Sequence, residues 1–266
     1  MVSLYDSLMA GTAKILLPDA AEQAACAECP IRHQSVCAMC MPDELETLEQ
    51  LKYYRHYEAG QTIVWSGDEM NFVGSVVRGV ATVSHTLQDG RKQMVGLLLP
   101  SDFIGRPGRR LSSYDVTAVT DVTLCCFRRK PFEQLISSTP NVAERLLDMS
   151  LDELDAAREW MLILGRKTAR EKIASFFTIL ARRAAAGDGS TPPAEAPAGA
   201  ITIDLPLTRE AMADYLGLTL ETVSRQISAL KNEGLISLEG KRRVRIPALR
   251  RLTAESGGGT EDLPAA

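Results

Sequence analysis

The chain has 266 residues, 45% of them hydrophobic, and a formal net charge of −4 at pH 7. This composition is that of a globular protein with room for two modest domains, and it excludes a surface that binds nucleic acid everywhere. No apolar run could span a bilayer and residues 1–20 lack signal-peptide features, so we expect a cytoplasmic protein with no membrane contact. Thiols stay reduced in that compartment, so the six cysteines indicate metal or redox chemistry.

The first motif is a cysteine segment at residues 26–40, CAECPIRHQSVCAMC, with the spacing C-x2-C-x7-C-x2-C. Soft thiolates select zinc or iron–sulfur clusters, and two C-x2-C pairs could close a zinc site of four thiolates. An iron–sulfur site would use three of these thiols and a distant one, Cys125 or Cys126. Composition alone does not choose between the metals, and we expect His33 to be a solvated loop residue.

Residues 58–128 change pattern, because short β-branched and apolar runs alternate there with turn signals such as Asp89-Gly90. Many short strands with such punctuation predict a small barrel or sandwich, here a jelly-roll β domain. The expected strands are 61–65, 73–77, 80–87, 93–98, 116–119 and 122–127.

Residues 141–164 are predicted to form one long helix. Four apolar residues recur on one side of it at heptad spacing, which indicates packing against a partner helix. They are Leu147, Leu151, Leu154 and Met161. Arg158 occupies the remaining seam position, and beside its own copy in a parallel dimer it would cost stability unless Asp155 or Glu159 compensates. The alternative is the core helix of a monomer, with Arg158 extending to water.

Residues 168–184 are expected to be the first helix of a C-terminal domain, and 187–200 a flexible loop. Residues 206–236 then read as two short helices around Gly217-Leu218, the pattern of a DNA-reading helix-turn-helix. Because paired helix-turn-helix units read paired half-sites, we favour a homodimer formed through the long helix.

The second of these short helices is amphipathic, with Val223, Ile227 and Leu230 in one stripe that faces inward. Arginine can donate to guanine and glutamate can accept from cytosine, and base-reading side chains lie near the start of a recognition helix. The residues expected to contact DNA in this helix and its cap are Thr219, Glu221, Ser224 and Arg225. An ordinary amphipathic helix is the alternative, which the caps, the glycine turn and the basic segment that follows disfavour.

Two apolar runs around Glu239-Gly240 predict a hairpin that would act as the wing of a winged helix-turn-helix. Its basic residues, Arg242 and Arg243 among them, would contact phosphates, which positions the protein without reading sequence. The predicted partner is therefore double-stranded DNA.

The sequence thus predicts an α+β protein with a jelly-roll β domain, a dimerisation helix and a winged helix-turn-helix. The expected segments are an N-terminal tail at 1–22, a cysteine loop at 23–42, a β-roll at 43–137, the helix at 138–166, the DNA-binding domain at 167–252 and a disordered tail at 253–266. No G-x-S-x-G, phosphate-cradling glycine loop or catalytic histidine motif is present, so we expect no enzymatic activity.

This order of parts resembles the Crp/Fnr family of bacterial transcription regulators over residues 23–250. The motifs that carry the resemblance are GQTIVWSGDE at 60–69, LLLPSDFIG at 97–105 and GLTLETVSRQISALKNEGLI at 217–236. The C-x2-C-x7-C part of the cysteine loop is similar to that of the oxygen-responsive Fnr branch, in its alphaproteobacterial type.

The resemblance implies an oxygen-labile 4Fe-4S cluster that controls dimerisation, with Cys26, Cys29 and Cys37 as three ligands. Alignment of the strand at 122–127 on its apolar residues makes Cys125 the fourth. Neighbouring strand residues point to opposite faces, so only one of Cys125 and Cys126 should serve. Cys40 departs from the family pattern and could substitute for Cys37 or be a spare.

The resemblance also implies that the family's E-x-x-S-R residues, here Glu221, Ser224 and Arg225, read an inverted repeat with TTGAT-like half-sites. It implies contacts with RNA polymerase through the hairpin loop at 85–92 and parts of the DNA-binding domain. The alternative function is a zinc-stabilised or cluster-free regulator that does not sense oxygen.

The cyclic-nucleotide branch of the family is the nearest rival within this fold. Its members hold the cyclic phosphate with a Gly-Glu turn and an arginine followed by a small residue. Residues 103–113 lack that glutamate, and the step Arg110-Leu111 does not match. We therefore expect no cyclic nucleotide ligand.

Overall fold

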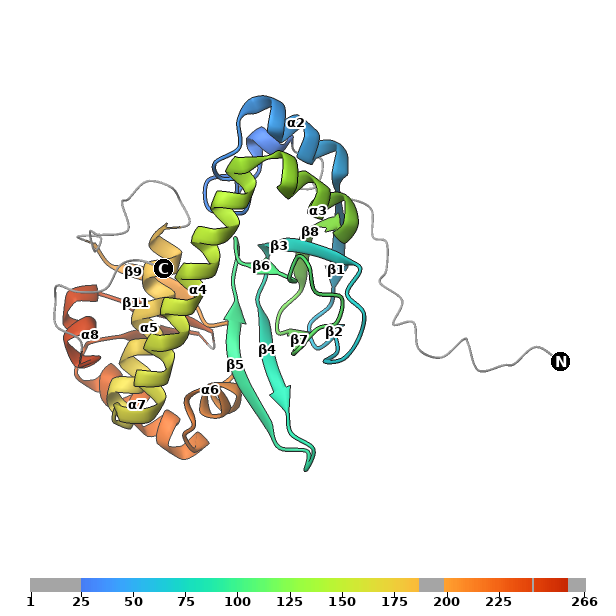
Figure 1. The fold of residues 1–266 in the computed structure, drawn as a ribbon. Coiled ribbons are helices and arrows are strands. Elements are labelled where there is room, and N and C mark those ends of the chain that lie inside the picture. The colour runs from blue at the N-terminus through green and yellow to red at the C-terminus, as the bar shows by residue number, and fades with distance from the viewer. Residues whose placement is uncertain (1–24, 187–198, 241, 258–266) are drawn as a thin grey trace.

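The computed structural model describes residues 25–186, 199–240 and 242–257 of the chain (Figure 1). An N-terminal β domain and a C-terminal domain are joined by one long helix, α4 (Pro140–Arg166). This arrangement confirms the predicted α+β architecture. The N-terminal tail expected at 1–22 and most of the loop expected at 187–200 lie outside the described residues.

The β domain consists of two four-stranded sheets with the orders β1-β8-β3-β6 and β2-β7-β4-β5, and all neighbouring strands are antiparallel. The strands are β1 (Lys52–Tyr57), β2 (Thr62–Val64), β3 (Phe72–Arg78), β4 (Ala81–Thr86), β5 (Lys92–Leu98), β6 (Phe103–Ile104), β7 (Asp115–Ala118) and β8 (Val122–Arg128). A core between the sheets includes Val76, Ala81 and Leu124, none of which is accessible to water. Each of the six predicted strands is present, and β1 and β6 are additional.

Helices cover one end of the β domain, at the top of Figure 1. They are η1 (Cys26–Glu28), α2 (Pro42–Leu51) and α3 (Arg129–Ser138). Phe132 of α3 stacks on Phe127 and Phe103, with ring centroids 5.2 and 5.8 Å away. Val142 of α4 and Val36 of the cysteine segment share this second core. The cysteine segment is therefore packed against both the sheet and the start of α4.

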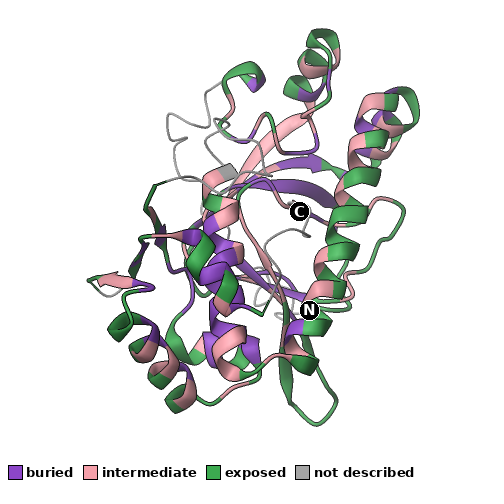
Figure 2. Cartoon of the chain, turned by 90° about the vertical axis from the view of Figure 1, so that its left-hand side faces the viewer, coloured by how far each residue is buried: buried purple, intermediate pink, exposed green. Residues whose placement is uncertain are grey.

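The long helix predicted at 141–164 is α4, and only Val142 and Ile163 within it are buried (Figure 2). The predicted seam residues are exposed in the single chain: Leu147 59%, Leu151 52%, Leu154 44% and Met161 66%. An apolar stripe of this kind is what a partner helix would cover.

The C-terminal domain packs helices around a three-stranded sheet of order β10-β11-β9. Its elements are α5 (Ala169–Ala186), β9 (Ile201–Asp204), α6 (Arg209–Leu216), α7 (Leu220–Asn232), β10 (Ser237–Glu239), β11 (Arg243–Ile246) and α8 (Leu249–Glu255). The predicted hairpin around Glu239-Gly240 is formed by β10 and β11. The predicted boundary at residue 252 is too early, because α8 continues to Glu255 and Thr253 is buried in it.

Within the described ranges, no helix has the length and apolar character needed to cross a membrane.

Candidate functional site

The helix-turn-helix is formed by α6 and α7, and both helices are capped as the sequence predicts. Thr208 Oγ1 accepts a hydrogen bond from Ala211 N at 3.1 Å. Thr219 Oγ1 accepts one from Thr222 N at 3.2 Å. Gly217 between them has φ +60°, a left-handed conformation that favours glycine. These local features fix the turn that sets the second helix across the first.

The buried and exposed faces of α7 are those that the sequence predicts. Val223, Ile227 and Leu230 are at most 1% exposed in the domain core. Glu221 and Arg225 are exposed and Ser224 is half-buried near the helix N-terminus. The structure therefore brings the predicted base-reading residues together on one accessible surface, whereas Thr219 serves as the helix cap.

The wing presents Arg242 and Arg243 to solvent. Arg243 Nε lies 3.3 Å from Asp204 Oδ1, and both side chains are more than half exposed. An ion pair in water contributes little, so the guanidinium can exchange this carboxylate for a DNA phosphate. The wing follows α7 in the chain and adds these two arginines to the helix-turn-helix.

The cysteine site is a small cavity between the N-terminal segment and the β domain. Of the six cysteines, those that line it are Cys26, Cys29, Cys37 and Cys125. Cys125 reaches it from the middle of β8, where it lies opposite Tyr54 of β1 and Ser75 of β3. The structure thus brings the four thiols named from the sequence around one space, although Cys125 comes from a segment far from the other three.

The sequence left two choices of ligand open, Cys125 or Cys126 and Cys37 or Cys40, and the members of each pair have different surroundings in the structure. Cys126 points to the opposite side of β8, into the core between the sheets. There burial raises the pKa of its thiol to about 12, while Arg55 lowers it. Cys40 is buried in the second core and does not line the cavity.

Burial is the largest influence on the pKa values of three of the four cavity thiols. It raises the pKa of Cys125 well above the ordinary value, and the nearby thiols add to the shift. Burial also raises the pKa values of Cys26 and Cys29. Because these pKa values are raised, Cys26, Cys29 and Cys125 are neutral thiols at pH 7 without a bound cation, and a metal would have to displace their protons to bind.

In the part of the chain that the structure describes, no three His, Cys, Asp or Glu side chains are close enough to hold one metal ion. A closed zinc site needs four sulfurs at about 2.3 Å from a single ion. The cavity has a volume of about 20 Å³, so the cysteine segment would have to move for either zinc or a cluster to bind. An iron–sulfur cluster takes its thiolates on separate irons, so its ligands surround a wider space.

Two arginines and a serine at this site were not predicted. Arg32 donates to the backbone oxygens of Cys37, Ala38 and Cys40 at 2.5, 2.8 and 2.9 Å. The buried Ser35 places its Oγ 3.0 Å from Cys37 Sγ. These contacts hold the cysteine segment in a compact turn, and no periodic pattern in the sequence signals them.

Arg145 connects the same segment to α4. Its Nη2 donates to Gln34 O at 2.6 Å and its Nε to Ser35 O at 3.4 Å. Asn141 Nδ2, one turn earlier on α4, donates to both carboxylate oxygens of Glu44 at 2.9 and 3.0 Å. The cysteine segment is therefore fastened to the helix that carries the exposed apolar stripe.

Arg158 lies in the apolar stripe, as predicted, and Asp155 compensates it. The distance from Arg158 Nη1 to Asp155 Oδ1 is 2.9 Å, and both side chains are more than 60% exposed. Such a solvent-exposed pair offsets only part of a like-charge repulsion.

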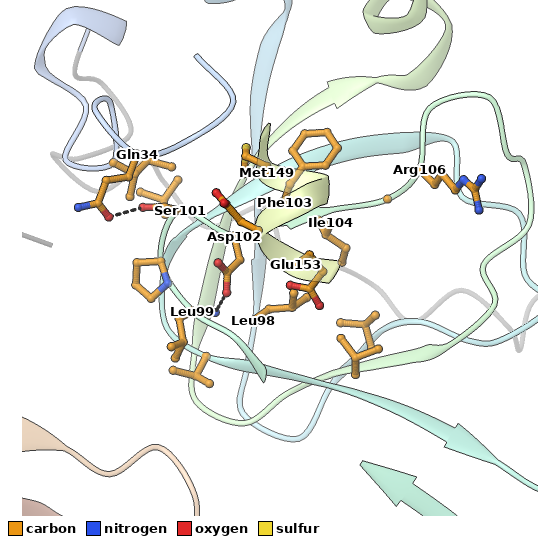
Figure 3. Close-up of a pocket in the computed structure, with 18 of the residues that line it drawn as sticks. Gln34, Leu98, Leu99, Ser101, Asp102, Phe103, Ile104, Arg106, Met149 and Glu153 are labelled. Carbon is orange, nitrogen blue, oxygen red and sulfur yellow. Dashed lines mark hydrogen bonds between the residues drawn. The ribbon is translucent and has the colours of Figure 1, made fainter. Parts of the chain in front are cut away.

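A cavity of about 1080 Å³ opens between the β domain, α4 and the C-terminal domain (Figure 3). Gln34 of the cysteine segment, Asp102 and Phe103 of the β domain, and Met149 and Glu153 of α4 border it. The cavity is the place where the cysteine segment, the long helix and the β domain meet.

A two-sheet β domain, a long helix with an uncovered apolar stripe and a capped helix-turn-helix with a wing define a DNA-binding transcription regulator. Two family models match the chain: "Cyclic nucleotide-binding domain" over residues 54–139 and "Crp-like helix-turn-helix domain" over residues 171–255. The chain belongs to the Crp/Fnr family, whose members regulate transcription rather than catalyse reactions.

Within the family, the chain is similar to regulators named FnrL and FixK. The chain is 64% identical over 236 residues to the transcriptional activator protein FnrL of Cereibacter sphaeroides, covering 89% of this chain and 93% of FnrL. It is 35% identical over 213 residues to the nitrogen fixation regulation protein FixK of Bradyrhizobium diazoefficiens, covering 80% and 86%. The solved structure of FixK2 from Bradyrhizobium japonicum has a TM-score of 0.68 and 31% identity, covering 78% of this chain and 98% of that one.

The family match to a cyclic nucleotide-binding domain concerns the β domain as a fold. The expectation that no cyclic nucleotide binds depends on residues 103–113, and it stays a prediction.

Proposed function

We propose that this protein is an oxygen-responsive transcriptional activator in which a 4Fe-4S cluster controls dimerisation and DNA binding. The single observation that carries the proposal is the cavity lined by Cys26, Cys29, Cys37 and Cys125. The likeness to FnrL, a transcriptional activator, supports the regulatory role. When bound, the cluster would supply a centre that oxygen oxidises.

The donor set fits an iron–sulfur cluster. All four candidate ligands are thiols, which such clusters prefer. The cavity is otherwise lined mainly by apolar side chains, including Leu48, Val36 and Phe127. A water-poor, sulfur-rich space of this kind suits a cluster better than a hard cation, which prefers oxygen ligands.

The protein's own residues connect this cavity to the dimer. Cys125 of β8 lines the same cavity as the three cysteines of the segment, so a cluster held by all four would join the segment to β8. Arg145 joins the segment to α4 through two backbone oxygens. With the segment held in place, α4 is supported on one side and offers Leu147, Leu151 and Leu154 to a partner on the other. Release of the segment removes that support, so dimer formation weakens.

Dimer formation and DNA binding are thermodynamically linked. A two-fold pair of recognition helices would lie about 34 Å apart, one DNA turn, and would read an inverted repeat of TTGAT-like half-sites. Whatever favours the dimer then favours the operator complex. On DNA, the hairpin around residues 85–92 would contact RNA polymerase.

Anaerobic purification tests the proposal directly. We expect a brown protein that contains iron and sulfide, bleaches in air and binds an inverted-repeat duplex more tightly under argon than in air. Alanine substitution of Cys26, Cys29, Cys37 or Cys125 should remove most of the iron. The matched controls Cys40→Ala and Cys126→Ala should keep it.

Two results would overturn the proposal. A colourless protein that contains zinc would instead identify a regulator that does not sense oxygen. Equal affinity for the duplex in air and under argon would remove the coupling between the cluster and DNA.

A further inference from the structure

The C-terminal domain is attached to the β domain by a polar contact outside the cysteine site. Arg183 of α5 forms a hydrogen-bonded ion pair with Asp102, which lies just before β6. We propose that Asp102 is a positioning residue for DNA recognition, because this pair fixes the orientation of the C-terminal domain, which carries the helix-turn-helix, relative to the β domain. The inference uses the DNA binding that defines the family and the two-fold binding proposed above.

Asp102 is held in place independently of Arg183. Its Oδ2 accepts a hydrogen bond from Leu99 N at 2.8 Å, which leaves Oδ1 for Arg183 (Figure 3). Its backbone N donates to Leu99 O at 3.0 Å, and its backbone O accepts from Val76 N at 2.9 Å. The carboxylate is therefore preorganised, and the arginine side chain has to come to it.

The pair is partly shielded from water. The side chain of Asp102 is 18% exposed and that of Arg183 is 29% exposed. Burial lowers the pKa of the Arg183 guanidinium, but Asp102, followed by Glu153 of α4, more than offsets this, so that the pKa is raised. Because screening is weaker here than on the open surface, this contact contributes more to domain orientation than an ordinary surface ion pair.

Apolar contacts accompany the ion pair. Met94 and Leu97 of β5, together with Leu99, pack against the core of the C-terminal domain. Trp160 of α4 stacks on Tyr215 of α6, with ring centroids 4.1 Å apart and planes inclined by 19°. Apolar surfaces can slide over one another, whereas a charged hydrogen bond between a fixed carboxylate and a guanidinium is directional. The ion pair therefore adds a directional polar constraint to the stacked rings and the apolar contacts.

The docked orientation is compatible with DNA binding. Glu221 and Arg225 remain exposed on α7, and so do Arg242 and Arg243 on the wing. Only residues 167 and 168 connect α4 to α5, so the ion pair restricts rotation about a short connection. Domains that are ordered beforehand lose less entropy on binding. In a dimer, the same restriction favours one separation of the two half-sites.

The test compares two duplexes under argon. One is the inverted repeat that the parent protein selects from a random pool, and the other has two base pairs inserted between its half-sites. For the parent we expect a clear preference for the first duplex. Asp102→Asn keeps an acceptor for Leu99 N but removes the charge. We expect it to bind the first duplex about tenfold more weakly and to lose much of the spacing preference.

Companion variants separate orientation from folding. Arg183→Gln should behave like Asp102→Asn, and Arg183→Lys should recover much of the spacing preference because it restores the charge. Glu69→Gln removes a more exposed ion pair, with Arg110 in the same β domain, and it should leave the preference unchanged. A loss of folded protein lowers binding to both duplexes equally, so the ratio of the two affinities isolates orientation.

If Asp102→Asn and Arg183→Gln retain the parent's ratio, the positioning role is wrong. A parent protein with no spacing preference would refute the paired binding proposed above, and this inference with it.

Discussion

Leu151 offers a direct test of the dimer surface on α4. It lies in the middle of the apolar stripe and is 52% exposed in the single chain. We expect Leu151→Ala to weaken the dimer without unfolding the protomer, because the substitution removes surface that only a partner would cover.

The size of the effect follows from this exposure. Burying a whole leucine side chain stabilises a protein by about 2 kcal/mol, so covering the exposed half contributes about 1 kcal/mol. A symmetric dimer contains the residue twice, which gives ~2 kcal/mol, or roughly a 30-fold higher Kd for the dimer.

Sedimentation equilibrium of anaerobically purified protein, without DNA, measures this constant. The matched control is Leu220→Ala, because Leu220 is 51% exposed but begins the recognition helix rather than lying on α4. The control should keep the parent's Kd. A Leu151→Ala protein that dimerises as tightly as the parent would show that this stripe is not the dimer contact.

Three further substitutions test separate parts of the account. Arg158→Leu removes a like charge that Asp155 offsets only weakly, so sedimentation in air should detect more dimer than for the parent. A variant that stays as monomeric as the parent would contradict the packing of α4 against its own copy. Arg225→Ala should cost about 1–3 kcal/mol of operator affinity and relax one base position, and an unaltered base preference in a binding assay would exclude it as a reader. Arg145→Gln weakens the hold on the cysteine segment, so trypsin should cleave after Arg32 several-fold sooner; an unchanged cleavage rate would mean that Arg145 does not hold it.

Features encoded in neighbouring residues could be predicted from the sequence. The spacing of Val223, Ile227 and Leu230 and the two threonine caps specify the helix-turn-helix locally, and the structure contains it as predicted. Strand β1 was missed because its residues are mostly half-buried, so they show no clear alternation of apolar and polar positions.

Features that depend on the packing of distant segments could not be predicted in this way. Alternation along β8 implies that Cys125 and Cys126 face opposite sides, but only the position of the cysteine segment determines which side is the cavity. Arg145 binds backbone oxygens, which carry no residue-specific signal. Asp102 and Arg183 are 81 residues apart and belong to different domains, so no local pattern links them.

The turn at residues 99–102 has an unusual backbone. Ser101 has φ +82°, rare for a residue other than glycine, and it is 9% exposed. Its hydroxyl donates to Gln34 Oε1 at 3.3 Å (Figure 3). The next residue, Asp102, is paired with Arg183 of the C-terminal domain. A left-handed residue surrounded by neighbours has few alternative conformations, so this turn is stiff. Neighbouring residues of this turn thus contact the cysteine segment and α5, which places the two segments next to each other without α4 between them.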